Sequence, residues 1–348
     1  MMPLTPEQPL EPVAMPPTEG FFRKEYPTLA DPHAPDGVIP LDRFWEKQKF
    51  PPWLMAILAL FLFFLLFNLI GAVFMVGSLL VQAGAKPIDF TQIDKLLTKD
   101  FLGQLVGNTI GQFLGLGLPA LLLARGHSSH WKDFLRIRLV EGKIIFWSVL
   151  GLVTLYPLIA FSAELNGWLP APQFVQEMDK LREEFILGIL KESSVWINLL
   201  AIALTPAICE EVLFRGYIQR QVERSITPFW AIVVTGTVFG MYHMSYAQVL
   251  PLSLIGIYLC WLTWKTGSIL PAVVVHFVNN GFSVVMASSL MGQKDFDPAK
   301  MEQIPLPWYG MLPLVVLGIL GFWYVSKKMH PNTEAVQPPT AMKTEFLT

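Results

Sequence analysis

Long apolar runs are the feature that most restricts what this chain can fold into. Eight such runs follow the first fifty residues, and each is long enough, or nearly so, to cross about 30 Å of hydrocarbon. Inside a bilayer the backbone has no water to bond, so a single run satisfies its polar groups only as a helix. The sequence therefore predicts an all-α polytopic membrane protein of about eight transmembrane helices. The predicted spans are 52–82, 101–124, 144–166, 195–214 and onward, 228–246, 248–264 (the shortest), 268–290 and 305–326.

The composition agrees with a membrane protein and argues against other classes. Of 348 residues, 53% are hydrophobic and only 15% are charged, which is unlike a soluble domain. The formal net charge of −2 offers no basic surface, so nucleic acid is not an expected partner. The two cysteines, Cys209 and Cys260, lie inside apolar runs and are too few for a disulfide framework.

The segments around the runs divide the chain into five parts. The first fifty residues hold ten prolines, which break helices and interrupt sheets, so a mostly disordered arm is expected there. The polar tail is expected to be disordered as well. The predicted parts are the arm at 1–50, three helices and an amphipathic loop at 51–194, a core at 195–290, the last loop and helix at 291–326, and the tail at 327–348.

The distribution of Lys and Arg predicts the orientation in the membrane. With eight spans, 17 of the 25 Lys and Arg residues fall on the side that carries both termini. Because positive loops stay on the cytoplasmic side, both termini are expected in the cytoplasm. The expected location is the inner membrane of a prokaryotic cell.

The third connecting loop, residues 164–194, contains an apolar pattern at helical spacing. Val175, Met178, Leu181 and Phe185 recur three or four residues apart among charged residues. This pattern predicts an amphipathic helix on the membrane surface. Such a helix serves either as a lid or substrate guide or as a plain connector, and the pattern does not distinguish these roles.

Two adjacent glutamates interrupt the fourth apolar run. A charge in the bilayer core costs on the order of 2.5–3.5 kcal/mol, so Glu210 and Glu211 need a reason to lie there. Arg215 follows Glu211 by four residues and can pair with it, which leaves Glu210 without a local partner. The plain alternative is that both glutamates mark the point where the helix leaves the membrane. Pro206 is expected to kink the helix and open an intramembrane cavity beside Glu210.

Two histidines and an asparagine lie in later runs. His276 and Asn280 are four residues apart and therefore share one helix face, while His243 lies in the fifth run. At 1.5 Å per residue, these three residues and Glu210 reach similar depths, roughly 14–22 Å from the same membrane side. The spacing thus predicts that these groups meet inside the membrane.

This set of side chains supports more than one chemistry. A carboxylate and an imidazole around one water form a general base, and a second histidine with an amide can bind an oxyanion. Glu210, His243 and His276 also suit a catalytic zinc ion. Neither an HExxH nor a GxSxG motif is present. A proton-coupled transporter would use intramembrane Glu and His as well.

Three motifs resemble those of one family. Glu210 to Arg215 is similar to an EExxxR signature, Phe239 to His243 to FxxxH, and His276 to Asn280 to HxxxN. All three, in this order, are typical of the CPBP family, which contains the CAAX proteases and bacteriocin-processing enzymes. The resemblance covers about residues 195–285 and points to type II CAAX prenyl endopeptidase-like members.

The resemblance implies an intramembrane endopeptidase with its catalytic core at 195–290. Glu210 and His243 would activate water, and His276 and Asn280 would bind the oxyanion. The supporting residues would be Glu211, Arg215 and Phe239. The implied substrate is a membrane protein or a lipidated peptide. A catalytically silent binding or immunity protein on the same fold is the alternative.

The resemblance leaves the cofactor open. Metal-free glutamate catalysis is slightly favoured, and a zinc site, which would need two histidines from different helices and a carboxylate, is possible but not required. If zinc is used, the candidate ligands are Glu210, His243 and His276.

Overall fold

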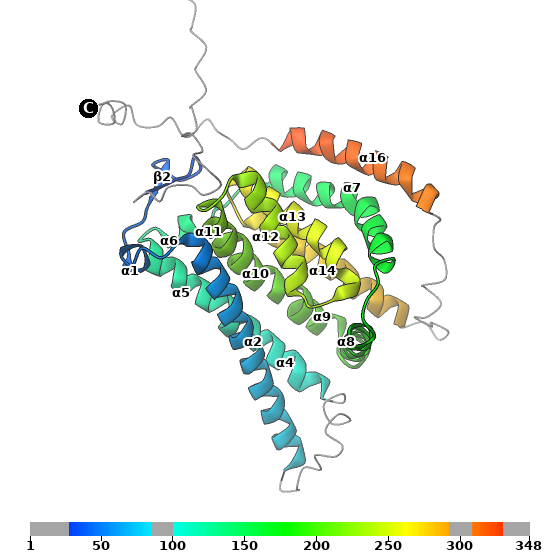
Figure 1. Cartoon of the computed structure of the whole chain (residues 1–348). Helices are drawn as coiled ribbons and strands as arrows, with labels where there is room; N and C mark the ends of the chain where they lie inside the picture. The colour runs from blue at the N-terminus through cyan, green and yellow to red at the C-terminus, as the bar shows by residue number, and fades with distance from the viewer. Residues whose placement is uncertain (1–27, 85–99, 292–307, 330–348) are drawn as a thin grey trace, which may run out of the picture.

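The computed structural model describes residues 28–84, 100–291 and 308–329. In this part of the chain, helices joined by loops make up all the regular structure except one short hairpin (Figure 1). Within this described part, seven helical spans are long and apolar enough to cross a membrane, which confirms the all-α polytopic architecture. The spans are Pro52–Gln82, Gly103–His127, Gly142–Gly167, Val195–Glu223, Tyr246–Thr266, Leu270–Leu290 and Tyr309–Lys328.

Five of these spans are built on single α-helices. They are α2 (Pro52–Ala83), α7 (Gly142–Gly167), α13 (Val249–Thr266, after the 3₁₀ turn η5 at Tyr246–Gln248), α14 (Leu270–Met291) and α16 (Trp308–Lys328). α16 packs along α7 on one side of the molecule (Figure 1).

The two remaining spans contain wider π-helical turns. The second span consists of α4 (Phe101–Gly111), η2 (Gln112–Gly117) and α5 (Leu118–His127). The fourth consists of α9 (Val195–Asn198), η3 (Leu199–Leu204), α10 (Thr205–Glu211), η4 (Val212–Ile218) and α11 (Gln219–Glu223). π-Helical turns inside α-helices are frequent at functional sites. η3 ends two residues before Pro206, the position where a helix distortion was predicted.

The fifth apolar run forms a shorter helix than predicted. α12 (Pro228–Tyr242) has 15 residues and extends only about 22 Å. The predicted span reached residue 246, but the backbone of Met244 has a left-handed φ of 52°, which a continuing helix does not allow. The sixth run, predicted to be the shortest, forms the full span Tyr246–Thr266 instead. His243 therefore lies at a helix end and not within a helix.

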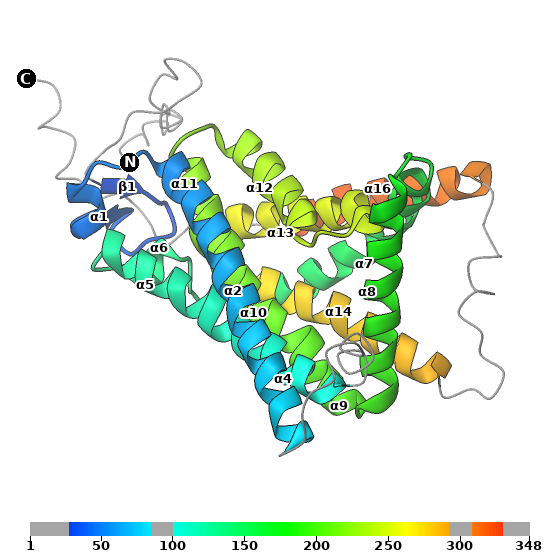
Figure 2. The same cartoon turned by 60° about the horizontal axis from the view of Figure 1, so that its bottom comes forward.

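The fourth span forms the centre of the bundle and is the most buried of the seven spans. α10 contacts η2 on one side and α14 on the other, and it lies between α2 and α14 in two views (Figures 1 and 2). Leu213, Phe214 and Tyr217 of η4 are completely buried. This tight packing fixes the side chains that follow Glu210 and Glu211 in the helix.

Glycines allow α12 and α13 to pack closely. A Cβ atom added to Gly236 would collide with the backbone of Ile257, and one added to Gly240 would collide with Ser253. Small residues at such spacing let membrane helices approach each other. This packing fixes the end of α12, from which His243 projects.

α8 (Gln173–Glu192) confirms that the loop 164–194 contains a helix. It stands at one side of the bundle, where it contacts α4, α14 and η5 (Figure 2). Met178 and Leu181, on its predicted apolar face, are exposed and therefore available to lipid. Its position on the membrane surface stays a prediction.

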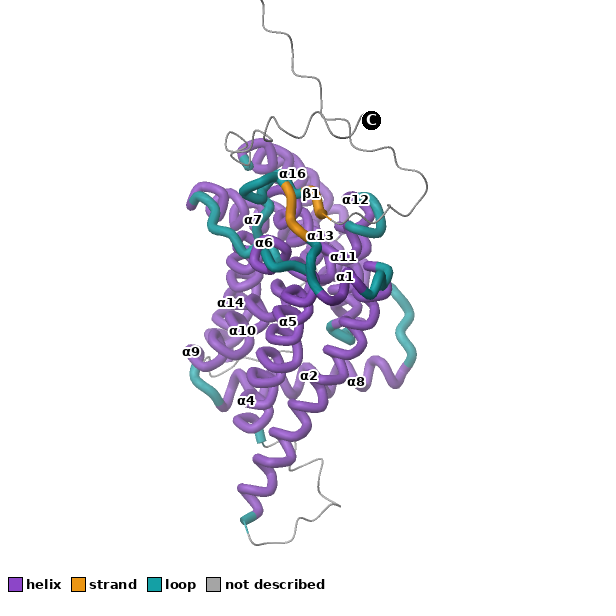
Figure 3. Tube along the Cα trace, turned by 90° about the vertical axis from the view of Figure 1, so that its left-hand side faces the viewer, coloured by secondary structure: helices purple, strands orange, loops and turns teal. Residues whose placement is uncertain are grey.

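Residues 28–50 are ordered, unlike the mostly disordered arm predicted for 1–50, whose first 27 residues lie outside the described structure. β1 (Thr28–Ala30) and β2 (Val38–Pro40) form an antiparallel hairpin, and α1 (Phe44–Lys47) follows. These elements lie at one end of the bundle with α11 and α6 (Trp131–Phe134) (Figure 3). The proline count missed this order because Ile39 in the hairpin is completely buried in the main core.

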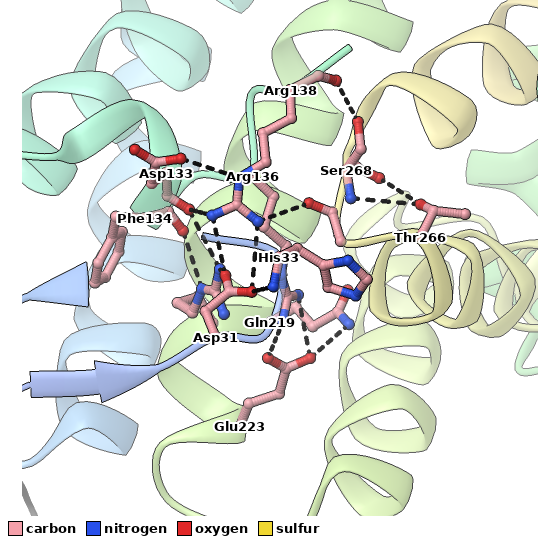
Figure 4. A network of polar contacts seen from close by, with 12 residues as sticks. Asp31, His33, Asp133, Phe134, Arg136, Arg138, Gln219, Glu223, Thr266 and Ser268 are labelled. Carbon is pink, nitrogen blue, oxygen red and sulfur yellow. Dashed lines mark hydrogen bonds and ion pairs between the residues drawn. The ribbon is translucent and has the colours of Figure 1, made fainter. Parts of the chain in front are cut away.

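A buried ionic network joins this hairpin to the helices (Figure 4). Asp31 accepts from Arg138 Nη2 at 3.1 Å and from Arg220 Nη2 at 2.7 Å. Arg136 pairs with Glu223 beside them. Burial alone would raise the pKa of Asp31, but the guanidinium groups of Arg220, Arg138 and Arg136 together hold it below its usual range. The network thus attaches the hairpin to the end of the central span.

Candidate active site

Glu210 and Glu211 end α10 and face different partners, because adjacent helical residues are rotated by about 100° from each other. Glu211 is completely buried, whereas the side chain of Glu210 is 12% exposed. The helix therefore directs one carboxylate into the protein interior and the other toward a different, less completely buried place.

Glu211 joins Arg215 and His276 in a buried cluster. Arg215 Nη1 donates to Glu211 Oε1 at 2.9 Å, as the spacing of four residues predicted. His276 Nδ1 bonds to the same oxygen at 2.8 Å, a contact between α10 and α14 that the sequence did not predict. Arg215 Nη2 also donates to the carbonyl of Gly256 at 3.1 Å, so the cluster includes α13.

The Glu211 carboxylate restricts where His276 carries its protons. An ionised carboxylate only accepts hydrogen bonds, so Nδ1 of His276 carries the hydrogen of this contact. In a neutral imidazole Nε2 is then an acceptor, and only the imidazolium form donates from both nitrogens. His276 can therefore donate from Nε2 only when it is protonated twice.

Glu210 faces His243 across a short gap. Glu210 Oε2 lies 3.8 Å from His243 Nε2, which is too long for a hydrogen bond and leaves the two groups able to share a water. His243 Nδ1 lies 2.8 Å from the carbonyl oxygen of Phe239, and a carbonyl only accepts. Nδ1 thus carries the hydrogen, and Nε2 of the neutral ring turns its lone pair toward Glu210. Within the described structure, Glu210 Oε2 is buried without a hydrogen-bond partner.

Phe239 packs against both histidines and against the arginine. Its ring centroid lies 4.7 Å from that of His243 and 5.8 Å from that of His276, in edge-to-face geometry. Arg215 Cζ lies 4.2 Å from the same ring centroid, a cation–π distance. Phe239 is almost completely buried, so it restricts the positions of all three side chains.

Asn280 contacts the fourth span beside Pro206. Asn280 Nδ2 donates to the carbonyl oxygen of Ile202 at 3.4 Å. In a regular α-helix that carbonyl would accept the N–H of residue 206, which a proline lacks. The proline therefore leaves a carbonyl available for an amide on another helix. An amide nitrogen has two hydrogens, so one of them stays available to Asn280.

One comparison with known proteins matches the part of the chain that carries these residues. Residues 192–282 match the family model described as Type II CAAX prenyl endopeptidase Rce1-like. The chain carries an Rce1-like domain. The match covers about a quarter of the chain, from the residues before α9 into α14. Comparison with curated proteins and with solved structures gave no match.

The Rce1-like domain contains every residue that the motifs singled out. The structure arranges them in two groups, Glu210 with His243 and Glu211 with Arg215 and His276, and Phe239 contacts members of both. Asn280 bonds to the fourth span and not to His276. The protein is thus an integral membrane protein that carries a CAAX-type intramembrane protease domain.

One polar residue outside the Rce1-like domain also contacts the site. Gln112 Nε2, at the start of η2, donates to Glu210 Oε1 at 3.2 Å. The prediction of site residues rested on ionisable groups within the spans and on the three motifs, and it did not include this glutamine. Its amide in the middle of an apolar span, shortly after Asn108 and Thr109, was the available signal.

α8 also reaches the site from outside the Rce1-like domain. Arg182 donates to the carbonyl of His243, and the backbone N–H of Ala247 donates to Asp179 Oδ2 at 2.9 Å. α8 therefore holds the turn that follows α12 from its outer side. α8 thus packs against the candidate site, and its role as a lid or substrate guide stays a prediction.

The side chains do not assemble a metal site in the described structure. No group of three or more His, Cys, Asp or Glu side chains lies close enough to hold a metal ion there. The candidate zinc ligands Glu210, His243 and His276 are divided between the two groups described above. The residues present therefore do not fit a zinc ion in this conformation.

Proposed function

We propose that the Rce1-like domain hydrolyses a peptide bond in a membrane-associated or lipidated protein, with water activated by Glu210 and His243. The observation that carries this proposal is the pairing of an unpartnered Glu210 Oε2 with the lone pair of His243 Nε2 at 3.8 Å. Buried polar atoms normally have a partner, so two inward-facing acceptors at this distance favour a bound water. Such a water is held by the two groups that can accept its hydrogens.

In the proposed hydrolysis, Glu210 first accepts a proton from the water and later donates it to the leaving nitrogen. Glu210 accepts one proton while the water oxygen attacks the carbonyl carbon, and His243 accepts a hydrogen bond from the remaining O–H. The carbonyl electron pair moves to its oxygen and forms a tetrahedral oxyanion. When the C–N bond breaks, Glu210 returns its proton to the departing nitrogen, and the carbonyl re-forms as a carboxylic acid.

His276 and Asn280 are proposed to bind the oxyanion. Asn280 has one amide hydrogen beyond the bond to Ile202, and His276 offers Nε2–H in its imidazolium form. Donors that are already oriented stabilise the developing charge without reorganising. Glu211, which bonds Nδ1 of His276, is proposed to orient the ring, and Arg215 is proposed to balance the charge of Glu211.

The substrate and orientation follow from the surroundings of the site. Glu210, His276 and Asn280 lie on membrane-spanning helices, and His243 lies at the end of the shorter apolar helix α12. A scissile bond close to a lipid anchor or a membrane segment would therefore reach these groups most easily. With α12 counted as an eighth, shorter crossing, both termini lie on the same side, and the excess of Lys and Arg there supports a cytoplasmic location by the positive-inside rule. The inner membrane of a prokaryotic cell is the location that we propose.

Cleavage of prenylated and unmodified peptides by the purified protein tests the proposal. Glu210→Gln keeps the shape and removes the base, so a loss of about 10²- to 10⁴-fold in kcat is expected. Glu141→Gln is the matched control, because Glu141 is exposed at the start of α7 and pairs with Lys143. The same assay with a chelator distinguishes a metal-dependent reaction from a glutamate reaction.

Two results would contradict the proposal. Equal cleavage by wild type and Glu210→Gln would place the chemistry elsewhere. Peptide binding without cleavage by the wild type would favour a non-catalytic binding protein on the same fold.

A further inference from the structure

We propose that Gln112 is a positioning residue for the general base, a role that rests on the proposed function of Glu210. Gln112 lies in the second span, about one hundred positions from the glutamate and outside the Rce1-like domain. Its amide Nε2 donates to Glu210 Oε1 at 3.2 Å. The donor of this bond therefore lies on a helix that contains no residue of the three motifs.

The bond determines which carboxylate oxygen faces His243. A carboxylate held at Oε1 cannot rotate freely about its terminal bond. With Gln112 on Oε1, the other oxygen, Oε2, is the one that lies 3.8 Å from His243 Nε2. Gln112 thus divides the carboxylate into a held oxygen and a reacting oxygen.

Close helix packing brings Gln112 to this place. η2 contacts α10 directly, and Gly117 of η2 lies against Cys209, the residue before Glu210. A Cβ atom added to Gly115 would come within 2.6 Å of the backbone of Phe67, so η2 is also pressed against α2. A helix confined on both sides holds the amide of Gln112 in register with the carboxylate.

The burial of Gln112 supports a specific role over incidental packing. Its side chain is almost completely buried, and an unpaired amide inside a membrane protein is costly. The Oε1 atom of Gln112 has no hydrogen-bond partner within the described structure, like Oε2 of Glu210. Gln112 and Glu210 are hydrogen-bonded to each other, and each has one acceptor oxygen without a partner, so the space between them is polar. There Gln112 Oε1 would accept a hydrogen bond from the water or the substrate.

A double-mutant cycle on kcat tests this role. Gln112→Met keeps the length of the side chain and removes the donor, and a hydrogen bond to a charged group is worth roughly 10- to 100-fold in rate. We expect kcat to fall by that factor with KM unchanged. In a Glu210→Asp background the shortened carboxylate no longer reaches Gln112, so adding Gln112→Met should lower kcat by less than about twofold.

Controls separate this role from a loss of structure. Thr109→Val lies one turn earlier and removes a hydroxyl that bonds only within its own helix, to the carbonyl of Leu105, so kcat should stay at the wild-type value. Gln112→Asn keeps the amide but shortens its reach, and it should reduce kcat like Gln112→Met. Thermal unfolding of the four cycle proteins in detergent, which needs no turnover, should show that Gln112→Met lowers Tm more in the wild type than in Glu210→Asp.

The outcomes distinguish the two proposals. A wild type that cuts no peptide overturns the proposed function, and the positioning role with it. An active wild type whose kcat falls by the same factor in both backgrounds overturns only the positioning role, because Gln112 would then act independently of Glu210. Unchanged kcat in Gln112→Met and Gln112→Asn overturns it as well.

Discussion

Glu211 Oε1 accepts hydrogen bonds from His276 Nδ1 at 2.8 Å and from Arg215 Nη1 at 2.9 Å, although His276 lies 65 positions along the chain. One carboxylate oxygen therefore serves both a partner on its own helix and a partner on α14. The second oxygen, Oε2, is buried without a partner in the described structure. This cluster makes the orientation of His276 dependent on Glu211.

Glu211→Gln should destabilise the protein more than any surface change. The substitution leaves the guanidinium of the completely buried Arg215 without its charge partner, which typically costs about 3–5 kcal/mol. A clear fall in Tm in detergent is expected, whereas the exposed control Glu141→Gln should unfold like the wild type. Equal Tm values for both variants would contradict the pairing.

Phe239→Ala should lower both stability and cleavage. The ring packs against His243, His276 and Arg215, and removing a buried aromatic ring costs about 3–5 kcal/mol. Phe229→Ala on the same helix is the control, because Phe229 is 66% exposed. If Phe239→Ala unfolds, Phe239→Leu in the cleavage assay tests the same contact with a smaller loss. Wild-type kcat in Phe239→Leu would show that the ring does not position the histidines.

Arg182→Met should loosen the turn after α12. Arg182 donates to the His243 carbonyl, so its loss should speed hydrogen exchange of the backbone around residues 243–248. A moderate decrease in kcat, about five- to tenfold or roughly 1–1.4 kcal/mol, is expected. Lys180→Met is the matched control, because Lys180 is exposed on the same helix. Identical exchange in both variants would mean that α8 does not hold this turn.

The docking of the N-terminal hairpin should weaken in acid. Because Asp31 has a lowered pKa in the folded protein, its contribution to stability is fully present above the unfolded pKa of about 3.9 and is lost as the pH falls toward the folded value. Limited proteolysis of the hairpin should therefore become faster below about pH 4. Asp31→Asn should be cleaved quickly even at pH 7.

The exposed neighbour Asp36 provides the control for this experiment. Asp36→Asn in the same hairpin should retain the wild-type pattern at every pH. Slow cleavage of Asp31→Asn at neutral pH would contradict the role of Asp31 in attaching the hairpin.

The sequence predicted the parts of this protein that depend on local pattern. Apolar runs of sufficient length identified the membrane spans, because a backbone in lipid has no alternative to a helix. The spacing of four residues predicted the bond between Glu211 and Arg215, because such residues meet on one helix face. The three motifs pointed to the family whose model matches residues 192–282.

Only the tertiary structure decided how these parts meet. The end of α12 at Tyr242 depends on the backbone turn at Met244, and the order of residues 28–50 depends on burial of Ile39 and Asp31 against distant helices. Gln112 reaches Glu210 because η2 packs between α2 and α10, and Gly115 lets it lie against the backbone of α2. Contacts of this kind join residues far apart in the chain, and their energies depend on packing and burial that no local pattern contains.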